Sequence, residues 1–395
     1  MIQTTRPLIW VLAGLTMLGP MSVDMYLPAL PAMARSFQAD PASLQLTVTA
    51  FLLGFGLGPL VLGPLSDAIG RRKVLIGCVL TFVLASLLCA SANMVDELIG
   101  YRIIQAMSGG SATTIARTVV HDVEQGDRAA RTLSALMMVL SLSLMIAPSI
   151  GGLLLHAFGW PAIFHLLAAL GLASLISLIL FLPETLPQRR RQPLTLISIL
   201  EGYGQILRSR GPLGFTLAGA FAGGAMFAYI VATPFIFIDA FGLDPAVYGV
   251  LFAINMIGAI LINGINMRLI TRYGYRRMLA SASAALLVLG VGFVAVVLTG
   301  FGGVVGIACA VFAIVGLAHV MGTNGLTGAL DLVRERAGAM SASFASCRFA
   351  AGVLATSAVG FLGDGTAWPL AAVVLACAVA AAFATAMALL AEPQR

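Results

Sequence analysis

Three charged side chains lie well inside long apolar stretches of this sequence: Asp24, Arg102 and Arg348. A charged side chain at the centre of a lipid bilayer costs about 2.5–3.5 kcal/mol even on lenient scales, so such residues mark sites that bind protons, ions or cargo. Asp24 is the one carboxyl group well inside such a stretch. A carboxyl group that gains and loses a proton under the influence of a guanidinium is the chemistry that these residue types allow.

Patterns typical of enzymes and nucleotide-driven pumps are absent from the sequence. It contains no Ser/His/Asp set in the apolar stretches, no HExxH motif and no phosphate-binding glycine loop. The cysteines fall in apolar runs without the spacing of metal ligands, at Cys78, Cys89, Cys309, Cys347 and Cys377. We therefore expect a protein that is not an enzyme, that holds no metal and that uses no cofactor.

The elements that must position these residues are membrane helices. Hydrophobic residues make up 60% of the 395 residues and charged residues only 10%, and a soluble chain of this composition would expose aggregating apolar patches. Apolar runs long enough to cross a bilayer recur along the chain. We predict an all-α membrane protein with twelve spans at 8–34, 44–66, 74–93, 97–120, 132–156, 161–182, 213–239, 246–267, 277–299, 302–329, 339–361 and 367–391.

Basic residues are distributed very unequally between the two sides of these spans. Of the 22 Lys and Arg, Arg102, Arg117 and Arg348 lie within spans, and Arg35 alone lies on the side reached after odd-numbered spans. The other 18 lie on the opposite side, which places both termini in the cytoplasm. The net charge of +6 thus reflects topology, and we expect no nucleic-acid partner.

The chain reads as two six-helix bundles, 1–182 and 213–395, joined by a cytoplasmic linker at 183–212. In the linker, Leu196, Leu200, Tyr203 and Leu207 have helical spacing, which predicts an amphipathic helix on the membrane surface; a plain basic linker fits the spacing equally well. The segment 70–75 (GRRKVL) recurs at 274–279 as GYRRML, about half the chain away. Parallel repeats of this kind are typical of secondary transporters with pseudo-symmetric halves.

The loop between the second and third spans contains Gly63, Asp67, Gly70, Arg71 and Arg72. Glycine permits a tight turn and a close approach of helices, and a carboxylate between cations or at a helix N-terminus makes charge-assisted hydrogen bonds. We predict that this cluster is a conformational latch on the cytoplasmic side; a loop that only sets topology is the alternative.

The fifth predicted span contains Pro148, Gly151 and Gly152. A proline inside a helix removes one backbone hydrogen bond and bends the helix, and the two glycines allow a neighbouring helix to pack closely. A bent helix without any special role in transport is the alternative.

Several of these segments together resemble one transporter family. The loop at 63–73 resembles the signature loop of the major facilitator superfamily, and the segment around Pro148 resembles its antiporter motif. The stretches 24–31 (DMYLPALP), 234–239 (PFIFID) and 347–349 (CRF) resemble the Bcr/CflA subfamily of drug:proton antiporters, which includes the bicyclomycin resistance protein and exporters of chloramphenicol and florfenicol. The resemblance implies the major facilitator fold and proton-coupled export of antibiotics across the bacterial inner membrane.

Asp24 and Arg102 are predicted to couple transport to protons. Both lie some 7–9 Å below the outer membrane face by the helical rise of 1.5 Å per residue, and the first and fourth spans are neighbours in this fold class. We therefore predict that the two side chains pair. Burial favours the protonated carboxyl and Arg102 favours the carboxylate, so forming and breaking the pair would move a proton. A purely structural ion pair is the alternative.

The cargo cavity is predicted to be amphiphilic, because methionine and aromatic side chains suit varied apolar drugs. The predicted cargo-binding residues are Met21, Met25, Tyr26, Phe227, Tyr229, Phe235, Asn255, Asn324 and Arg348. Arg348 would contact either cargo or backbone carbonyl groups. Export of a metabolite such as an amino acid or a sugar remains the alternative function. The expected partners are drug molecules, protons and membrane lipid, and the carrier is expected to act as a monomer.

Overall fold

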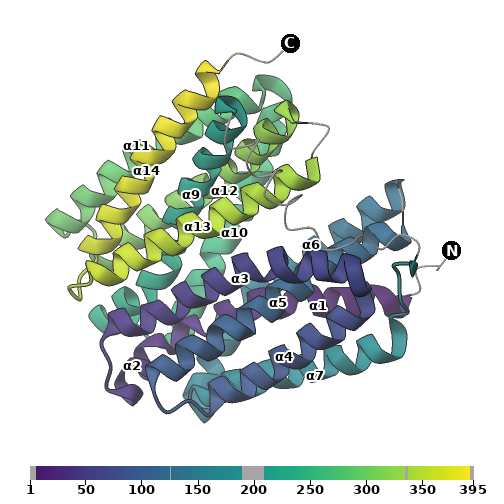
Figure 1. The fold of residues 1–395 in the computed structure, drawn as a ribbon. Helices are drawn as coiled ribbons and strands as arrows, with labels where there is room; N and C mark the ends of the chain where they lie inside the picture. The colour runs from purple at the N-terminus through teal and green to yellow at the C-terminus, as the bar shows by residue number, and fades with distance from the viewer. Residues whose placement is uncertain (1–5, 125, 189–208, 334–336, 392–395) are drawn as a thin grey trace. The chain divides into compact units, whose positions relative to one another are not determined.

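The computed structural model describes residues 6–124, 126–188, 209–333 and 337–391, and the regular elements in these ranges are all helices. Eleven of the described segments are long and apolar enough to cross a membrane. Helix α5 (Val95–Val123) has the length of a span as well, at 29 residues, but Arg102 and Gln105 make it more polar. With α5, the described chain contains the twelve predicted spans of an all-α membrane protein (Figure 1).

The chain forms two compact units, Met1–Leu194 with Asp244–Ala253, and Thr195–Leu243 with Ile254–Arg395. Unit 1 holds α1 (Arg6–Asp24), η1 (Leu27–Ala29), α2 (Leu30–Phe37), α3 (Pro41–Ile69), α4 (Arg71–Ala90), α5, α6 (Gly126–Phe158) and α7 (Pro161–Phe181). Unit 2 holds α9 (Arg210–Pro234), η3 (Phe235–Ala240), most of α10 (Pro245–Tyr273), α11 (Tyr275–Thr299), α12 (Gly303–Leu332), α13 (Ala337–Phe361) and α14 (Trp368–Leu390).

The two units repeat one packing pattern. In unit 1, α1 packs against α5, α6 and α7, and α4 packs against α5 and α7. In unit 2, α9 packs against α12, α13 and α14, and α11 packs against α12 and α14. The halves are therefore pseudo-symmetric, as the internal sequence repeat predicted. The predicted amphipathic helix of the linker, at 196–207, lies outside the described residues, and the division of the chain at this linker remains a prediction.

The first predicted span is present at Leu8–Phe37, but the structure shows that it is not one continuous helix. Helix α1 ends at Asp24, and the chain continues through Met25 and Tyr26 into η1 and α2. Pro28 explains this break, because a proline in a helix lacks the N–H group and its ring clashes with the carbonyl group four residues earlier, here that of Asp24. The seventh span changes as well, because α9 ends at Pro234 and a π-helix, η3, follows.

Glycines let α3 and α5 approach at backbone distance. A Cβ atom added at Gly54 would lie 2.5 Å from the carbonyl oxygen of Ile103, and one added at Gly58 would lie 2.3 Å from that of Met107. Such contacts are closer than real Cβ atoms make, so only glycine fits here. The interface thereby fixes α5, the helix that carries Arg102, against α3.

Replacing Gly58 by alanine is expected to destabilise the protein by about 1–3 kcal/mol, the usual penalty for an overpacked core, because the backbone of α5 must move. Thermal unfolding of the purified protein in detergent measures the change. Gly77→Ala in α4 is the matched control, because nothing lies within 4 Å of a Cβ atom there. Equal unfolding temperatures for the two variants would contradict this account of the interface.

Candidate functional site

Asp24 lies at the last residue of α1, where the helix is interrupted. Its side chain is 3% exposed, and its Oδ2 atom is buried without a hydrogen-bond partner among the described residues. An ionised carboxylate in this position would be strongly disfavoured, because a buried charge needs a counter-charge or hydrogen-bond donors.

Arg102, on α5, is fully buried and binds the same segment of the chain. Its Nη1 atom donates hydrogen bonds to the backbone carbonyl oxygen of Ser22, at 2.9 Å, and to Oε1 of Gln105, at 2.7 Å. Its guanidinium carbon lies 4.4 Å from the ring centroid of Tyr26 and 4.3 Å from that of Phe51. Contacts of a cation with the faces of aromatic rings partly replace the hydration that burial removes.

The predicted ion pair between Asp24 and Arg102 is not formed in this structure, and a pair that forms in another conformation remains a prediction. Within the described part of the chain no ion pair joins them. Arg102 instead donates a hydrogen bond to the carbonyl group of Ser22, two residues before Asp24. The helical rise predicts how deep a residue lies in the membrane. It does not predict the direction of a side chain at a helix break, such as that of Asp24. Arg102 nevertheless keeps two buried donor atoms, Nε and Nη2, without partners, as Asp24 keeps one unpartnered acceptor.

A close crossing of α1 and α5 holds Arg102 in place. A Cβ atom added at Gly109 would lie 3.1 Å from the Cα atom of Gly19, and Thr113 Oγ1 donates a hydrogen bond of 3.1 Å to the carbonyl oxygen of Thr16. Gln105 is oriented in turn, because its Nε2 atom donates a hydrogen bond of 2.8 Å to Ser86 Oγ on α4. The guanidinium is thus positioned by α1, α3 and α5, and α4 acts on it through Gln105.

Helix α6 reaches the same break through Gly151. A Cβ atom at this position would lie 2.0 Å from the carbonyl oxygen of Met25, the residue that follows Asp24. Pro148 lies inside α6, and Gly152 is buried beside Gly151. The predicted close packing at Gly151 is therefore present, and it places this motif directly against the segment that carries Asp24.

The predicted latch residues gather around Arg71, which is largely buried. Arg71 forms an ion pair with Asp67, and its Nε atom donates to Asp122 Oδ2 at 3.1 Å. Gly70 has a φ of 110°, which an L-residue rarely adopts, and it separates α3 from α4. Arg72 donates from Nη2 to the carbonyl oxygen of Ile179 at 2.9 Å. Gly63 differs from the others, because a Cβ atom there would meet nothing within 4 Å.

Two acids belong to this cluster that the sequence analysis did not assign to it, Glu184 and Asp122. Glu184 caps α4, because its carboxylate oxygens accept the backbone N–H groups of Arg71, at 2.9 Å, and Arg72, at 3.3 Å. Asp122, at the end of α5, accepts from Arg71. The sequence signal for Glu184 was its place in the segment 183–185 (PET), which directly follows the sixth span and precedes a polar linker.

Unit 2 contains a matching arrangement at the repeated loop. Tyr275 donates from its hydroxyl group to Asp331 Oδ2 at 2.9 Å, and Arg276 Nη2 donates to the carbonyl oxygen of Leu389 at 3.0 Å. Asp331 lies near the end of α12, the counterpart of α5, and Leu389 near the end of α14, the counterpart of α7. Tyrosine has thus taken the place of the arginine in the second copy.

The predicted cargo-binding residues of unit 1 occupy different surroundings. Tyr26 is fully buried, with its hydroxyl group hydrogen-bonded to Thr47 and its ring against Arg102, so it supports the arginine. Met21 lines a cavity of about 180 Å³ between α1 and α7, and Met25 is fully buried at the helix break. Contact of these side chains with cargo remains a prediction.

In unit 2, two pairs of buried polar side chains stand out. Asn255 donates to the hydroxyl group of Tyr229 at 3.1 Å, and Asn324 donates to Asn266 Oδ1 at 3.0 Å. The two aromatic residues on α9 and η3, Phe227 and Phe235, are each 9% exposed. The structure therefore joins Tyr229 with Asn255, and a common cavity for all the predicted residues remains a prediction.

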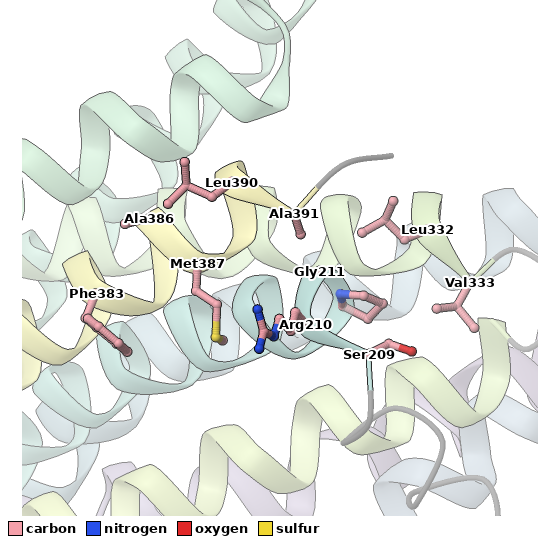
Figure 2. A pocket seen from close by; sticks show the side chains of 11 residues that line it. Ser209, Arg210, Gly211, Leu332, Val333, Phe383, Ala386, Met387, Leu390 and Ala391 are labelled. Carbon is pink, nitrogen blue, oxygen red and sulfur yellow. The ribbon is translucent and has the colours of Figure 1, made fainter. Parts of the chain in front are cut away.

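A larger cavity, of about 700 Å³, lies at the ends of α9, α12 and α14, away from these residues (Figure 2). Arg210 at the start of α9, Leu332 near the end of α12, and Phe383 and Met387 on α14 line it. None of the predicted cargo-binding residues is among its lining residues. We therefore do not assign cargo to it.

Comparison with known proteins shows the family to which this chain belongs. The model described as Major Facilitator Superfamily matches residues 12–356. The chain belongs to the major facilitator superfamily. It is thus a multi-pass membrane transporter.

Relatives within this superfamily include proteins named for drug resistance. The chain is 29% identical to a bicyclomycin resistance protein homolog of Haemophilus influenzae over 377 residues, which cover 95% of the chain and 94% of that protein. It is 28% identical to a chloramphenicol resistance protein of Pseudomonas aeruginosa over 281 residues, or 70% and 65% of the two chains. The MFS-type transporter YdgK of Bacillus subtilis is 37% identical over 259 residues, and the match spans 65% of this chain and 64%, just under two thirds, of that relative.

Solved structures show the same fold. A bacterial homolog of the human lysosomal transporter Spinster has a TM-score of 0.76 at 16% identity, covering 98% of this chain and 97% of its own. The nucleoside transporter NupG has a TM-score of 0.74 at 14% identity, covering 98% and 100%. These superfamily members support the fold and carry no information on the cargo of this chain.

Proposed function

We propose that this superfamily member is a proton-coupled antiporter that exports small, largely apolar drugs across the bacterial inner membrane by alternating access. One observation carries the proposal: a buried acceptor on Asp24 and two buried donors on Arg102 lack partners among the described residues, although Arg102 binds the backbone of Ser22, two residues before Asp24. The drug-resistance relatives support the cargo class. Export of a metabolite such as an amino acid or a sugar is the alternative.

The unpartnered groups suggest two states of one switch. In the first state Asp24 holds a proton and Arg102 binds the carbonyl group of Ser22. In the second state the segment after α1 shifts and Asp24 loses its proton. The Nε–H and Nη2–H groups of Arg102, which have no partner among the described residues in the first state, then donate hydrogen bonds to the Asp24 carboxylate. Arg102 thus acts as the positioning residue for deprotonation. Cargo that enters the same region competes with the proton, which is sufficient for antiport.

The cluster around Arg71 is proposed to be the conformational latch on the cytoplasmic side, and to act by holding the helix ends of unit 1 together. Its ion pairs with Asp67 and Asp122 and the Glu184 cap all lie within unit 1, so they keep α3, α4 and α5 together as one body. The bias of Lys and Arg supports cytoplasmic termini in the bacterial inner membrane. The proposed carrier works as a monomer surrounded by lipid.

Inside-out membrane vesicles test the coupling, because export then appears as uptake. Acidification of the vesicle lumen is expected to drive accumulation of chloramphenicol or bicyclomycin, and an uncoupler is expected to abolish it. Competition by a panel of antibiotics, amino acids and sugars separates the two cargo classes. Accumulation that persists in the uncoupler would contradict proton coupling, and competition by metabolites alone would favour the alternative.

A further inference from the structure

Arg348, on α13, is half-buried and has almost no partners among the described residues. Its one hydrogen bond among the described residues runs from Nη2 to Met226 Sδ at 3.6 Å, and its Nε atom is buried without any. A thioether is a weak acceptor, and arginine carries five N–H donors that stay charged. No acid therefore compensates the positive charge of this half-buried side chain among the described residues.

The helices packed against α13 place no acid beside Arg348, because the one acid of α12, Asp331, lies at the end of that helix. Helix α9 carries no charged residue after Arg210, α12 contributes His319, and α14 has none. His319 lies near enough to interact electrostatically with Arg348, but its Nδ1 atom already makes a hydrogen bond of 2.9 Å with Val315. The acids in the described part of unit 2 are Asp239, Asp331 and Asp364, which lie at helix ends or in a loop.

Glycines make the space around the guanidinium. A Cβ atom added at Gly223, on α9, would lie 2.6 Å from Arg348 Cγ and 2.8 Å from its Nε. A Cβ atom added at Gly322, on α12, would lie at an ordinary 3.7 Å from Nη1. The absence of a side chain at Gly223 therefore allows the arginine to lie against α9.

We propose that Arg348 is an anion-binding subsite in unit 2 that takes the carboxylate of an acidic cargo molecule. A carboxylate matches the fork of guanidinium N–H groups and supplies the missing charge. Phe227 and Phe349 directly follow Met226 and Arg348 in the sequence, and their ring centroids lie 5.7 Å apart. We expect this pair of rings to contact the apolar body of such a molecule. The inference rests on the proposed function only in treating the chain as a carrier of small molecules.

Equilibrium dialysis of the purified carrier against acid and ester forms of one compound tests the subsite without any proton gradient. The probes are nalidixic acid and fusidic acid, each with its methyl ester, at a pH where the acids are ionised. The wild-type protein is expected to bind the acids more tightly than the esters. Arg348→Gln is expected to reduce this acid-to-ester preference about 10- to 100-fold, as expected for the loss of charged hydrogen bonds.

A pair of glycine variants keeps the test valid if Arg348→Gln does not fold. Gly223→Ala displaces the guanidinium and is expected to reduce the same preference, whereas Gly322→Ala is expected to retain it. A wild-type protein without a preference, or an Arg348→Gln variant that weakens acid and ester equally, would overturn the subsite. Failure of proton-driven uptake in vesicles would overturn the antiport proposal and leave these binding results standing.

Discussion

The Asp24→Asn variant is expected to fold and to bind cargo but to lose proton-driven export completely. Asparagine has nearly the shape of the protonated side chain, so the buried position at the end of α1 accepts it. Because it removes a buried carboxyl group without a partner, the thermal stability should stay the same or rise. An amide cannot take up and release a proton, so a pH gradient should no longer move cargo.

Two measurements on reconstituted vesicles check this expectation. Uptake driven by a pH gradient should fall to the background of empty vesicles, while exchange of labelled for unlabelled cargo continues. Asp364→Asn is the control, because hydrogen bonds from Thr366 hold the pKa of this loop carboxyl below its usual range and it stays ionised at physiological pH. Undiminished gradient-driven uptake by Asp24→Asn would reject Asp24 as the coupling residue.

The Gly151→Ala variant is expected to damage both stability and export. Its added methyl group would lie 2.0 Å from the carbonyl oxygen of Met25, and backbone atoms cannot rotate away as a side chain can. Overpacking of this kind costs about 1–3 kcal/mol. The forced shift also moves the neighbouring Asp24, so export should fall more than the loss of folded protein explains.

Export per folded carrier, compared with thermal unfolding in detergent, separates the two effects of Gly151→Ala. Gly100→Ala on α5 serves as the control, because a Cβ atom there meets nothing within 4 Å and alanine favours a helix. If Gly151→Ala matched Gly100→Ala in both measurements, the contact between α6 and the helix break would have no role in transport.

Much of the fold could be predicted because apolar length is a strong signal for membrane helices. Spans such as 161–182 and 277–299 agree closely with α7 (Pro161–Phe181) and α11 (Tyr275–Thr299). The break after Asp24 could not be read from hydropathy, since the segment stays apolar across it. Pro28 was the available signal, because its ring is incompatible with a helical carbonyl group at Asp24.

The candidate site was harder to predict than the helices. Sequence reasoning found Asp24 and Arg102 because buried charges are costly, but it paired them from depth alone. The hydrogen bond from Arg102 to the backbone of Ser22 has no sequence signal, since every residue carries a carbonyl group. Glu184 and Asp122 were missed because acids at helix ends look like ordinary surface residues until the fold brings them to α4.

Cargo-induced proton release from the purified carrier tests the central claim most directly. The protein in weakly buffered detergent solution receives chloramphenicol, and a pH indicator dye follows the medium. The account predicts that the wild-type protein releases protons when cargo binds, and that Asp24→Asn binds the same cargo and releases none. Equal release by the two proteins would contradict it.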